Sequence, residues 1–384
     1  MPVNSDRKNT LPHTIVARCY HDNTLRRVAI ANGIYQSIES VGTSSDSTLP
    51  WIAPGLVDPQ INGFGGVDFN RAPGDEHSLA KADQTLAACG CTHYLITFIT
   101  NIQNRYEELF NAWEAQRQTS ALGAMGYHLE GPFLNPDPSY RGAHQSDYMI
   151  APNLDFLTIC QRLSHQNIKL MTLAPEVDWP ESLSFIQEAV NRGVRLSVGH
   201  SSLMGDPLKQ SIQAGLSCWT HLGNAAPGNC HKFENVVLHA LASELPHVSL
   251  IPDGLHLPPH AFRALTRALG DRLILTTDAI AGTATSLKAS SLGELNVEIQ
   301  EDGRAMSGNR MAGSTLRPFD GVFRAAQMSG LPWFECWDAF STRTAAWLGV
   351  PHGFEVGKEA TFCLFEVQPT PKLRETWRKG IKVF

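Results

Sequence analysis

Carboxylate and imidazole side chains recur at the ends of short apolar segments in this chain of 384 residues. Glu130 ends AMGYHLE, His200 ends RLSVGH, His221 lies in CWTHL and Asp278 lies in LILTTDA. One carboxylate and two neutral imidazoles can bind a divalent cation such as zinc, with an open position left for water. Such a cation lowers the pKa of bound water to about 7, and Asp278 could accept the proton of that water. The pattern therefore indicates a metal-dependent hydrolase.

Each of these residues also has a simpler interpretation. A single histidine at the end of an apolar segment is typical of a core or capping residue, and Glu130 could cap a following helix. Asp278 could accept hydrogen bonds from backbone amides in the DAIAG turn. However, a buried carboxylate costs several kcal/mol unless it is paired. Four such residues at four segment ends favour one shared site.

The segments that carry these residues alternate with stretches of helical spacing. Two examples, SLAKADQTLAACG and ESLSFIQEAVNRG, each end at a glycine. Strands that alternate with helices predict a parallel sheet, and eight of them predict a closed (β/α)8, TIM-like barrel of the α/β class. In such barrels the catalytic groups come from the C-terminal ends of different strands. The eight predicted strands are residues 52–61, 92–99, 124–130, 169–175, 195–200, 218–222, 247–253 and 273–279.

The two ends of the chain have a different pattern. Residues 14–48 and 354–384 alternate apolar and polar residues, as strands do. From their position on either side of the barrel, we expect them to pair into a small β-sandwich domain. The predicted domains are residues 1–52 plus 354–384 for the β domain and residues 53–353 for the barrel.

The composition excludes several other classes of protein. A net charge of −6 and a pI near 6.2 give no basis for a nucleic-acid partner. No segment has the roughly 20 apolar residues of a membrane span, and the polar N-terminus MPVNSDRKNTLPH has no apolar stretch like that of a signal peptide. The eight cysteines form no spaced pairs and are expected to be reduced and mostly buried. We therefore expect a cytoplasmic protein.

Ten motifs follow one another along the chain. They are PGLVDPQINGFGGVDFN, YHLEGPFLN, RGAHQ, LAPE, VGHSS, THLGNAAPG, DGLHLPP, TTDAIAG, AGSTL and GKEATF. In type and in order they resemble the N-acetylglucosamine-6-phosphate deacetylases of the amidohydrolase superfamily, over about residues 51–365. The resemblance implies a (β/α)8 barrel with a small β domain formed by both termini. It also implies a homodimer that removes the acetyl group from a small-molecule amino-sugar phosphate, N-acetylglucosamine-6-phosphate.

The resemblance also assigns roles to individual residues. Glu130, His200 and His221 resemble the family's metal ligands, which agrees with the set found at the strand ends. Asp278 looks like the catalytic acid/base, and His144 of RGAH looks like a second catalytic residue that contacts the substrate beside its reacting amide. The implied sugar and phosphate contacts are His144, Asn224, Ala225, Lys232 and His256.

The segment DPQING departs from a common amidohydrolase pattern. Many members have His-x-His on the first strand to hold a second metal, whereas this chain has Gln60 and Asn62. Amide side chains are weak, neutral ligands, so we expect one metal and vestigial second-metal positions. One branch of the deacetylase family has the same Gln-x-Asn. The simpler interpretation is that both amides only hydrogen-bond neighbouring loops.

The phosphate contact is the second departure. In the family, an arginine shortly after the THLxNAMP motif reaches across the dimer to the substrate phosphate, and equal spacing gives Lys232 here. Lysine keeps the charge but cannot make a planar, two-point contact. His231, Arg141 and Arg317 are possible substitutes.

Several alternatives therefore stay open at this stage. The substrate could be N-acetylgalactosamine-6-phosphate or another N-acyl amino sugar, and a non-catalytic sugar-phosphate-binding barrel is a third hypothesis. We expect one divalent metal ion per subunit; Zn2+ suits the ligands, and Fe2+, Co2+ or Mn2+ could also bind two histidines and a glutamate.

Overall fold

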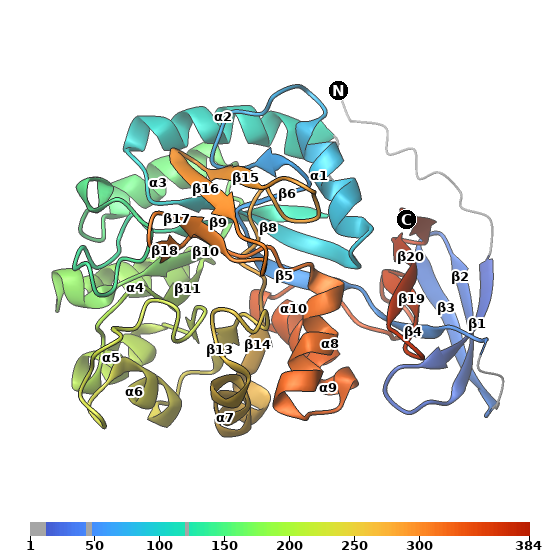
Figure 1. The fold of residues 1–384 in the computed structure, drawn as a ribbon. Helices are drawn as coiled ribbons and strands as arrows, with labels where there is room; N and C mark the ends of the chain where they lie inside the picture. The colour runs from blue at the N-terminus through green and yellow to red at the C-terminus, as the bar shows by residue number, and fades with distance from the viewer. Residues whose placement is uncertain (1–12, 44–47, 120–122) are drawn as a thin grey trace.

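The computed structural model describes residues 13–43, 48–119 and 123–384, and the first 12 residues of the predicted β domain lie outside this range. The described chain forms an eight-stranded barrel surrounded by helices, with a separate sheet beside it (Figure 1). The predicted fold class is thereby confirmed. No helix of the described chain has both the length and the apolar character needed to cross a membrane. Seven of the eight cysteines are buried, and all eight are free thiols.

The barrel strands are short, parallel and almost entirely buried. Helices cover their outer face, so their sequences are continuous apolar runs rather than alternating ones. In sheet order the strands are β14 (Leu273–Leu275), β13 (His247–Leu250), β12 (Cys218–Trp219), β11 (Arg195–Val198), β10 (Ile168–Leu173), β9 (Ala124–Glu130), β8 (Cys91–Ile99) and β5 (Leu56–Ile61).

Side chains close the barrel between its first and last strands. The hydrogen-bonded series of parallel strands begins at β5 and ends at β14. One isolated β-bridge, between Ile61 and Ala279, joins the ends of these two segments. The buried carboxylate of Asp58 accepts hydrogen bonds from the hydroxyls of Thr276 (2.7 Å) and Thr277 (2.6 Å). Asp58 thus fixes the segment that leads directly to Asp278.

Amphipathic helices surround the barrel. In α7, Phe262, Leu265 and Leu269 form the buried stripe, with the i, i+3, i+7 spacing of one helix face. This helix begins with a proline and ends at Gly270, which has a φ of 55°, as helix termini favour. The helices are α1 (Ser78–Ala87), α2 (Gln103–Thr119), α3 (Leu154–Leu163), α4 (Ser182–Asn191), α5 (Gly205–Ala214), α6 (Val236–Ala242), α7 (Pro259–Leu269), α8 (Pro318–Ser329), α9 (Trp333–Ala339) and α10 (Thr342–Leu348).

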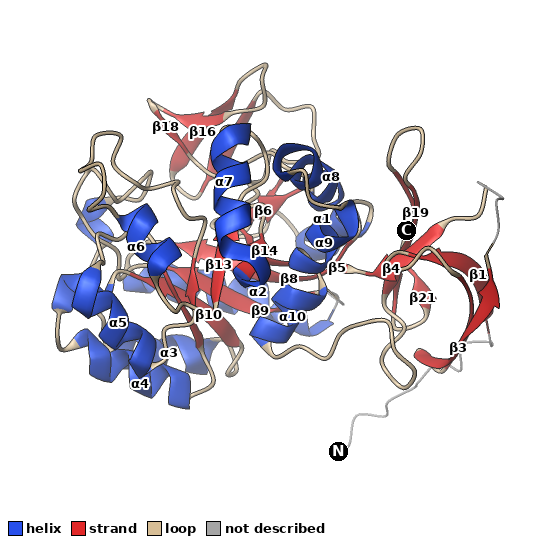
Figure 2. Ribbon diagram, turned by 90° about the horizontal axis from the view of Figure 1, so that it is seen from below, coloured by secondary structure: helices blue, strands red, loops and turns tan. Residues whose placement is uncertain are grey.

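Strands from both ends of the chain form one mixed, seven-stranded sheet, which curves around its own small core (Figure 2). The predicted pairing of the two ends is therefore confirmed. The link is β4, which pairs parallel to β1 and antiparallel to β19. The order is β21 (Ile381–Lys382), β20 (Lys372–Arg378), β19 (Phe362–Glu366), β4 (Trp51–Pro54), β1 (His13–Cys19), β2 (Leu25–Ala31) and β3 (Ile34–Gly42).

The prediction of residues 52–61 as one continuous barrel strand is wrong. Residues 52–61 divide at Gly55 into the end of β4, in the terminal sheet, and β5, in the barrel. A Cβ atom at Gly55 would lie 2.2 Å from the side chain of Thr92, so the chain passes between the two sheets where only glycine fits.

Five predicted strands end earlier than expected, and three of them end before a predicted site residue. Strands β11, β12 and β14 stop at Val198, Trp219 and Leu275, before His200, His221 and Asp278. These last three residues have positive φ values of 52°, 31° and 53°, and a left-handed residue cannot continue a strand. Such conformations cost about 1–3 kcal/mol each and cluster at functional sites.

A small antiparallel sheet between β14 and α8 was not predicted. It joins two hairpins whose two-residue turns are Gly293–Glu294 and Gly308–Asn309. In Figure 1 it lies over the barrel strands, and in Figure 2 it projects from the barrel on one side. Its strands are β15 (Ala289–Leu292), β16 (Leu295–Ile299), β17 (Ala305–Ser307) and β18 (Arg310–Met311).

Candidate active site

A cavity of roughly 290 Å³ lies where the barrel strands end, between their C-terminal loops and the β15–β18 sheet. Leu292, Leu295 and Met311 of that sheet form an apolar wall. Most of the residues predicted to act in catalysis or binding line the cavity. They are Asn62, Glu130, His144, His200, His221, Asn224, Ala225, His256 and Asp278.

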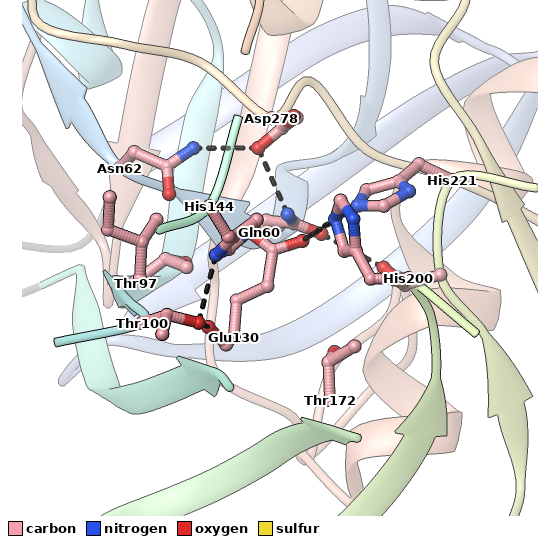
Figure 3. Close-up of polar contacts among 12 residues, drawn as sticks. Gln60, Asn62, Thr97, Thr100, Glu130, His144, Thr172, His200, His221 and Asp278 are labelled. Atoms are coloured by element: carbon pink, nitrogen blue, oxygen red, sulfur yellow. Dashed lines mark hydrogen bonds and ion pairs between the residues drawn. The ribbon is translucent and has the colours of Figure 1, made fainter. Parts of the chain in front are cut away.

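Glu130 is the centre of a cluster of imidazoles (Figure 3). Its Oε1 atom lies 2.7 Å from Nε2 of His221 and 3.3 Å from Nε2 of His200, and its Oε2 lies 3.7 Å from Nε2 of His144. Burial alone would raise the pKa of Glu130, but the hydrogen bonds of His200 and His221 outweigh it, and the pKa lies well below its usual value. Glu130 is therefore an ionised carboxylate at a buried site.

The donor set of this cluster fits a divalent metal ion. One nitrogen or oxygen atom from each of Glu130, His144 and His200 lies within 4.8 Å of the others, and His221 approaches Glu130 more closely still. Nδ1 of His200 is 3.0 Å from the carbonyl oxygen of Tyr140. Because a carbonyl can only accept, Nδ1 carries a proton, and Nε2 is the nitrogen that faces Glu130 and could ligate a metal ion. A carboxylate and imidazole lone pairs are the ligands that zinc prefers.

Asp278 is held at the edge of the cluster by two amides (Figure 3). Nε2 of Gln60 and Nδ2 of Asn62 donate to its Oδ1 atom at 3.0 and 2.6 Å. The hydroxyl of Thr220 donates to Oε1 of Gln60 at 2.9 Å, so the NH2 group of Gln60 must face the carboxylate. Burial, followed by the negative charge of Glu130, raises the pKa of Asp278 to about 6.

These contacts agree with the simpler interpretation, in which the two amides hydrogen-bond neighbouring loops. The residue that both of them bind is Asp278, in the loop after β14. Asn62 is 1% exposed, and its Oδ1 atom has no hydrogen-bond partner among the described residues.

His144 reaches the cluster from the loop after β9. Its Nδ1 is 3.0 Å from the hydroxyl of Thr100. Burial, with a smaller effect of His200, lowers the pKa of His144 to about 3, so the ring is neutral. The other ring nitrogen, Nε2, faces Oε2 of Glu130 at 3.7 Å and can act as a hydrogen-bond donor in the cavity when it carries the proton.

The sugar and phosphate contacts implied by the resemblance lie at two different places. His256 is oriented by Asp253, whose Oδ2 is 2.7 Å from Nδ1 of His256, and it lines the cavity with Asn224 and Ala225. Lys232 does not line the cavity. It is exposed, and its ammonium group lies 5.5 Å from the ring centroid of Phe233.

The three substitutes for Lys232 also lie outside the cavity lining. Arg317 pairs with Asp320 at the start of α8, and Arg141 donates to the carbonyl oxygen of His144. His231 accepts hydrogen bonds from backbone amides of its own loop.

Sequence reasoning missed several residues that hold this site. Thr100 and Thr220 contact His144 and Gln60, and Glu176 of the LAPE motif joins the loops that follow three strands. Oε1 of Glu176 accepts from Nδ2 of Asn135 (2.9 Å) and the backbone N–H of Ser202 (2.6 Å), and Oε2 accepts from Ser201 (2.7 Å). The glutamate after a strand was a visible signal, but its partners are distant in sequence.

No protein-family model matches the chain, but individual relatives do. N-acetylglucosamine-6-phosphate deacetylase of Danio rerio is 28% identical over 348 residues, covering 87% of this chain and 84% of the relative. The enzyme of the same name from Bacillus subtilis is 29% identical over 331 residues, covering 84% and 81%. That of Vibrio furnissii is 28% identical over 363 residues, covering 92% and 89%.

Solved structures agree with these relatives. A point mutant of N-acetyl-D-glucosamine-6-phosphate deacetylase from Mycobacterium smegmatis, in complex with N-acetyl-D-glucosamine-6-phosphate, is 25% identical with a TM-score of 0.86, covering 97% of this chain and 100% of that one. The Pasteurella multocida enzyme is 26% identical with a TM-score of 0.85, covering 96% and 99%. The likeness extends over the barrel and the terminal sheet together. Over most of its length, the chain is therefore similar to N-acetylglucosamine-6-phosphate deacetylases, in both sequence and fold.

Proposed function

We propose that this chain hydrolyses N-acetylglucosamine-6-phosphate to glucosamine-6-phosphate and acetate. The observation that carries the proposal is Asp278, a buried carboxylate held by two amides beside the Glu130 cluster in a cavity. A protein that only binds a sugar phosphate has no need of an acid/base group next to a metal-binding cluster. The relatives named above, which span most of the chain, support the substrate and the reaction.

In this proposal Glu130, His200 and His221 hold one divalent metal ion, which we take to be zinc, with iron, cobalt or manganese as alternatives. The Glu130 Oε1 atom is 3.3 and 2.7 Å from the two Nε2 atoms. A carboxylate oxygen and two imidazole nitrogens at these separations would suit one zinc ion. His144 is assigned to the substrate instead, because it faces the other carboxylate oxygen at 3.7 Å. The ion would supply Lewis-acid activation of water and of the acetyl carbonyl.

Asp278 carries the proton through the reaction. Oδ1 accepts both amide hydrogen bonds, which leaves Oδ2 to take a proton from the attacking water. The water oxygen forms a bond to the acetyl carbon. Asp278 then returns the proton to the sugar nitrogen as the carbon–nitrogen bond breaks, so that acetate and an amine leave. Nε2–H of neutral His144 donates to the acetyl oxygen, where negative charge develops.

The substrate contacts complete the proposal. Asn224, the backbone of Ala225 and His256 contact the sugar and its phosphate from the loops after β12 and β13. Lys232 reaches the phosphate only if a second copy of the chain lends it across a homodimer, because it lies outside the cavity of its own chain. Gln60 and Asn62 act on Asp278 and bind no second metal ion.

The first experiment measures acetate release by the zinc-loaded protein from N-acetylglucosamine-6-phosphate. Unphosphorylated N-acetylglucosamine and N-acetylgalactosamine-6-phosphate are assayed in parallel. Preference for the first substrate is the expected result. No acetate from any of the three would reject the deacetylase and favour the non-catalytic sugar-phosphate-binding barrel.

One observation favours a second candidate, a deacetylase of an unphosphorylated N-acyl amino sugar. Lys232, the residue in the place of the family's phosphate-binding arginine, is exposed and outside the cavity. Equal rates on the phosphorylated and plain sugars would support this candidate.

A further inference from the structure

The cavity contains one permanent positive charge that comes from outside the barrel. Arg310 begins strand β18 of the unpredicted β15–β18 sheet and lines the cavity. Of the described residues, no other arginine and no lysine belongs to the cavity lining. Glu130 and Asp278 supply the negative charges of the same cavity. The sheet therefore contributes a cation as well as an apolar wall.

Neutral groups hold the guanidinium of Arg310 in place. Nη1 donates to the carbonyl oxygen of Gly142, and Nη2 donates to that of Pro138 at 3.3 Å. Within the described chain Arg310 makes no ion pair with a carboxylate. Its full charge is thus uncompensated, and three of its five N–H groups are still available, since an arginine has five donors.

We infer that Arg310 is a specificity-determining residue that binds the phosphate of the substrate. This inference rests on the proposed function and names the phosphate contact within the same chain. A guanidinium grips phosphate oxygens with two parallel N–H groups, a geometry that Lys232 cannot offer. The two carbonyl contacts fix the side chain before substrate arrives, so little conformational freedom is lost on binding.

The position of Arg310 also suits a negatively charged group. A cation stabilises an anion that binds in the same cavity as the carboxylates of Glu130 and Asp278. Arg310 contacts the loop between Pro138 and Gly142, and this loop also approaches the Glu130 cluster, because a Cβ atom at Gly142 would lie 2.9 Å from the ring of His200. Arg310 and the cluster therefore border one cavity, and we place the phosphate against the β18 hairpin and the acetyl group against the cluster.

A purely structural role is the competing explanation, because the same contacts could serve only to hold the loop that carries His144. The two explanations differ in their effect on substrates without phosphate. If Arg310 only holds the loop, its replacement should slow the reaction of every substrate. If Arg310 binds the phosphate, its replacement should affect only phosphorylated substrates.

The test compares Arg310→Met and Arg310→Lys with the parent protein. Arg304→Met is the matched control: it removes an arginine near the same hairpins, but Arg304 pairs with Asp302 and lies outside the cavity. The readouts are KM and kcat for N-acetylglucosamine-6-phosphate and kcat/KM for N-acetylglucosamine. We expect Arg310→Met to raise KM for the phosphate ester about 10- to 100-fold, as for loss of a charge-assisted hydrogen bond. Its kcat/KM for the plain sugar should stay within about twofold, and Arg310→Lys should recover part of the loss.

Equal losses on both substrates, or a fall in kcat alone, would overturn the inference and favour the purely structural role of Arg310. An unchanged KM for the phosphate ester would also overturn it.

A binding measurement separates failure of this inference from failure of the proposed function. The shift in melting temperature caused by glucosamine-6-phosphate is compared with that caused by glucosamine. If the parent releases no acetate, the proposed function fails, but Arg310 is still tested. A phosphate-dependent shift that Arg310→Met abolishes supports the inference, and one that it leaves intact, or no such shift in the parent, rejects it.

Discussion

The side-chain amide of Asn62 donates a hydrogen bond of 2.6 Å to Oδ1 of Asp278. The two residues lie 216 positions apart and come from the first and last strand ends of the barrel. The amide occupies a position that holds a metal-binding histidine in many amidohydrolases. In this chain the residue at that position orients Asp278, the proposed acid/base, and Gln60 makes the same kind of contact at 3.0 Å.

Replacing Asp278 by asparagine should abolish turnover without displacing the metal. Asparagine keeps the size of the side chain but cannot take a proton from water. Loss of general acid–base catalysis typically costs 10²- to 10⁴-fold, so we expect kcat to fall by at least about 100-fold. Metal content, measured by atomic emission, should equal that of the parent. An Asp278→Asn variant with nearly parental activity would remove Asp278 from the mechanism.

Replacing Asn62 by alanine should shift the pH profile of activity. The Asn62 hydrogen bond stabilises the ionised form of Asp278 and lowers its pKa, against the larger effect of burial. Without it the pKa rises, so the base stays protonated to a higher pH. The acidic limb of kcat/KM should therefore move to higher pH than in the parent, with the metal site equally loaded in both.

The control for this shift is Asn70→Ala. Asn70 is also buried after β5, but its amide bonds the backbone of Asn62 and Thr97 rather than Asp278. The acidic limb of the kcat/KM profile of Asn70→Ala should match that of the parent. A limb that moves equally in both variants, or moves to lower pH for Asn62→Ala, would contradict the proposed role of Asn62.

Replacing the proposed metal ligands should lower metal content and activity together. The variants Glu130→Gln and His221→Ala each remove one donor of a three-residue site, so we expect less than half of the parental metal per chain. Chelation of the parent should abolish acetate release, and added zinc should restore it. His77→Ala, which removes an exposed histidine paired with Glu76, is the matched control. Full metal content in both ligand variants would exclude the proposed set.

Much of the candidate site could be predicted because it follows strand ends. The C-terminal ends of parallel strands meet at one rim, so residues that end separate apolar runs are brought together by the fold itself. Glu130, His200, His221 and Asp278 all line one cavity for this reason. The exact strand ends could not be predicted, because the apolar pattern does not reveal the left-handed backbone of His200, His221 and Asp278.

Residues that act through distant contacts were not predictable in the same way. Thr220 holds Gln60, and Thr100 holds His144, through side-chain hydrogen bonds that no periodicity encodes. The β15–β18 sheet is a different case, since its Gly293–Glu294 and Gly308–Asn309 turns are recognisable hairpin signals. We predicted no further strands of the barrel domain after residue 279, so the sheet that carries Arg310 was missed.

Replacing Glu176 by alanine should loosen the loops that carry the proposed metal ligands. Glu176 accepts hydrogen bonds from the loops after β9 and β11, and the backbone N–H of Asn135 in turn donates to the carbonyl oxygen of His200 at 3.1 Å. Without the carboxylate these donors lose their shared acceptor. We expect weaker zinc binding, by about 10-fold or more, as for outer-shell residues of metal sites. Competition with a chromogenic chelator measures this affinity directly. Glu181→Ala, which removes a nearby acid without these partners, is the control; equal affinities in parent and Glu176→Ala would refute the positioning role.

Replacing Arg378 by methionine should destabilise the junction between the terminal sheet and the barrel. Arg378, on β20, forms a buried ion pair with Asp83 of α1, and it is only 3% exposed. Removing one partner of a buried pair leaves an uncompensated charge, which costs about 3–5 kcal/mol of unfolding free energy. The exposed pair of Arg374 and Glu366 on the same sheet is the control, and Arg374→Met should cost less than about 1 kcal/mol. Urea unfolding of both variants measures the difference. The double variant Arg378→Met/Asp83→Leu should regain stability over Arg378→Met, because no charge then stays unpaired; a further loss would show that packing, not charge, dominates this contact.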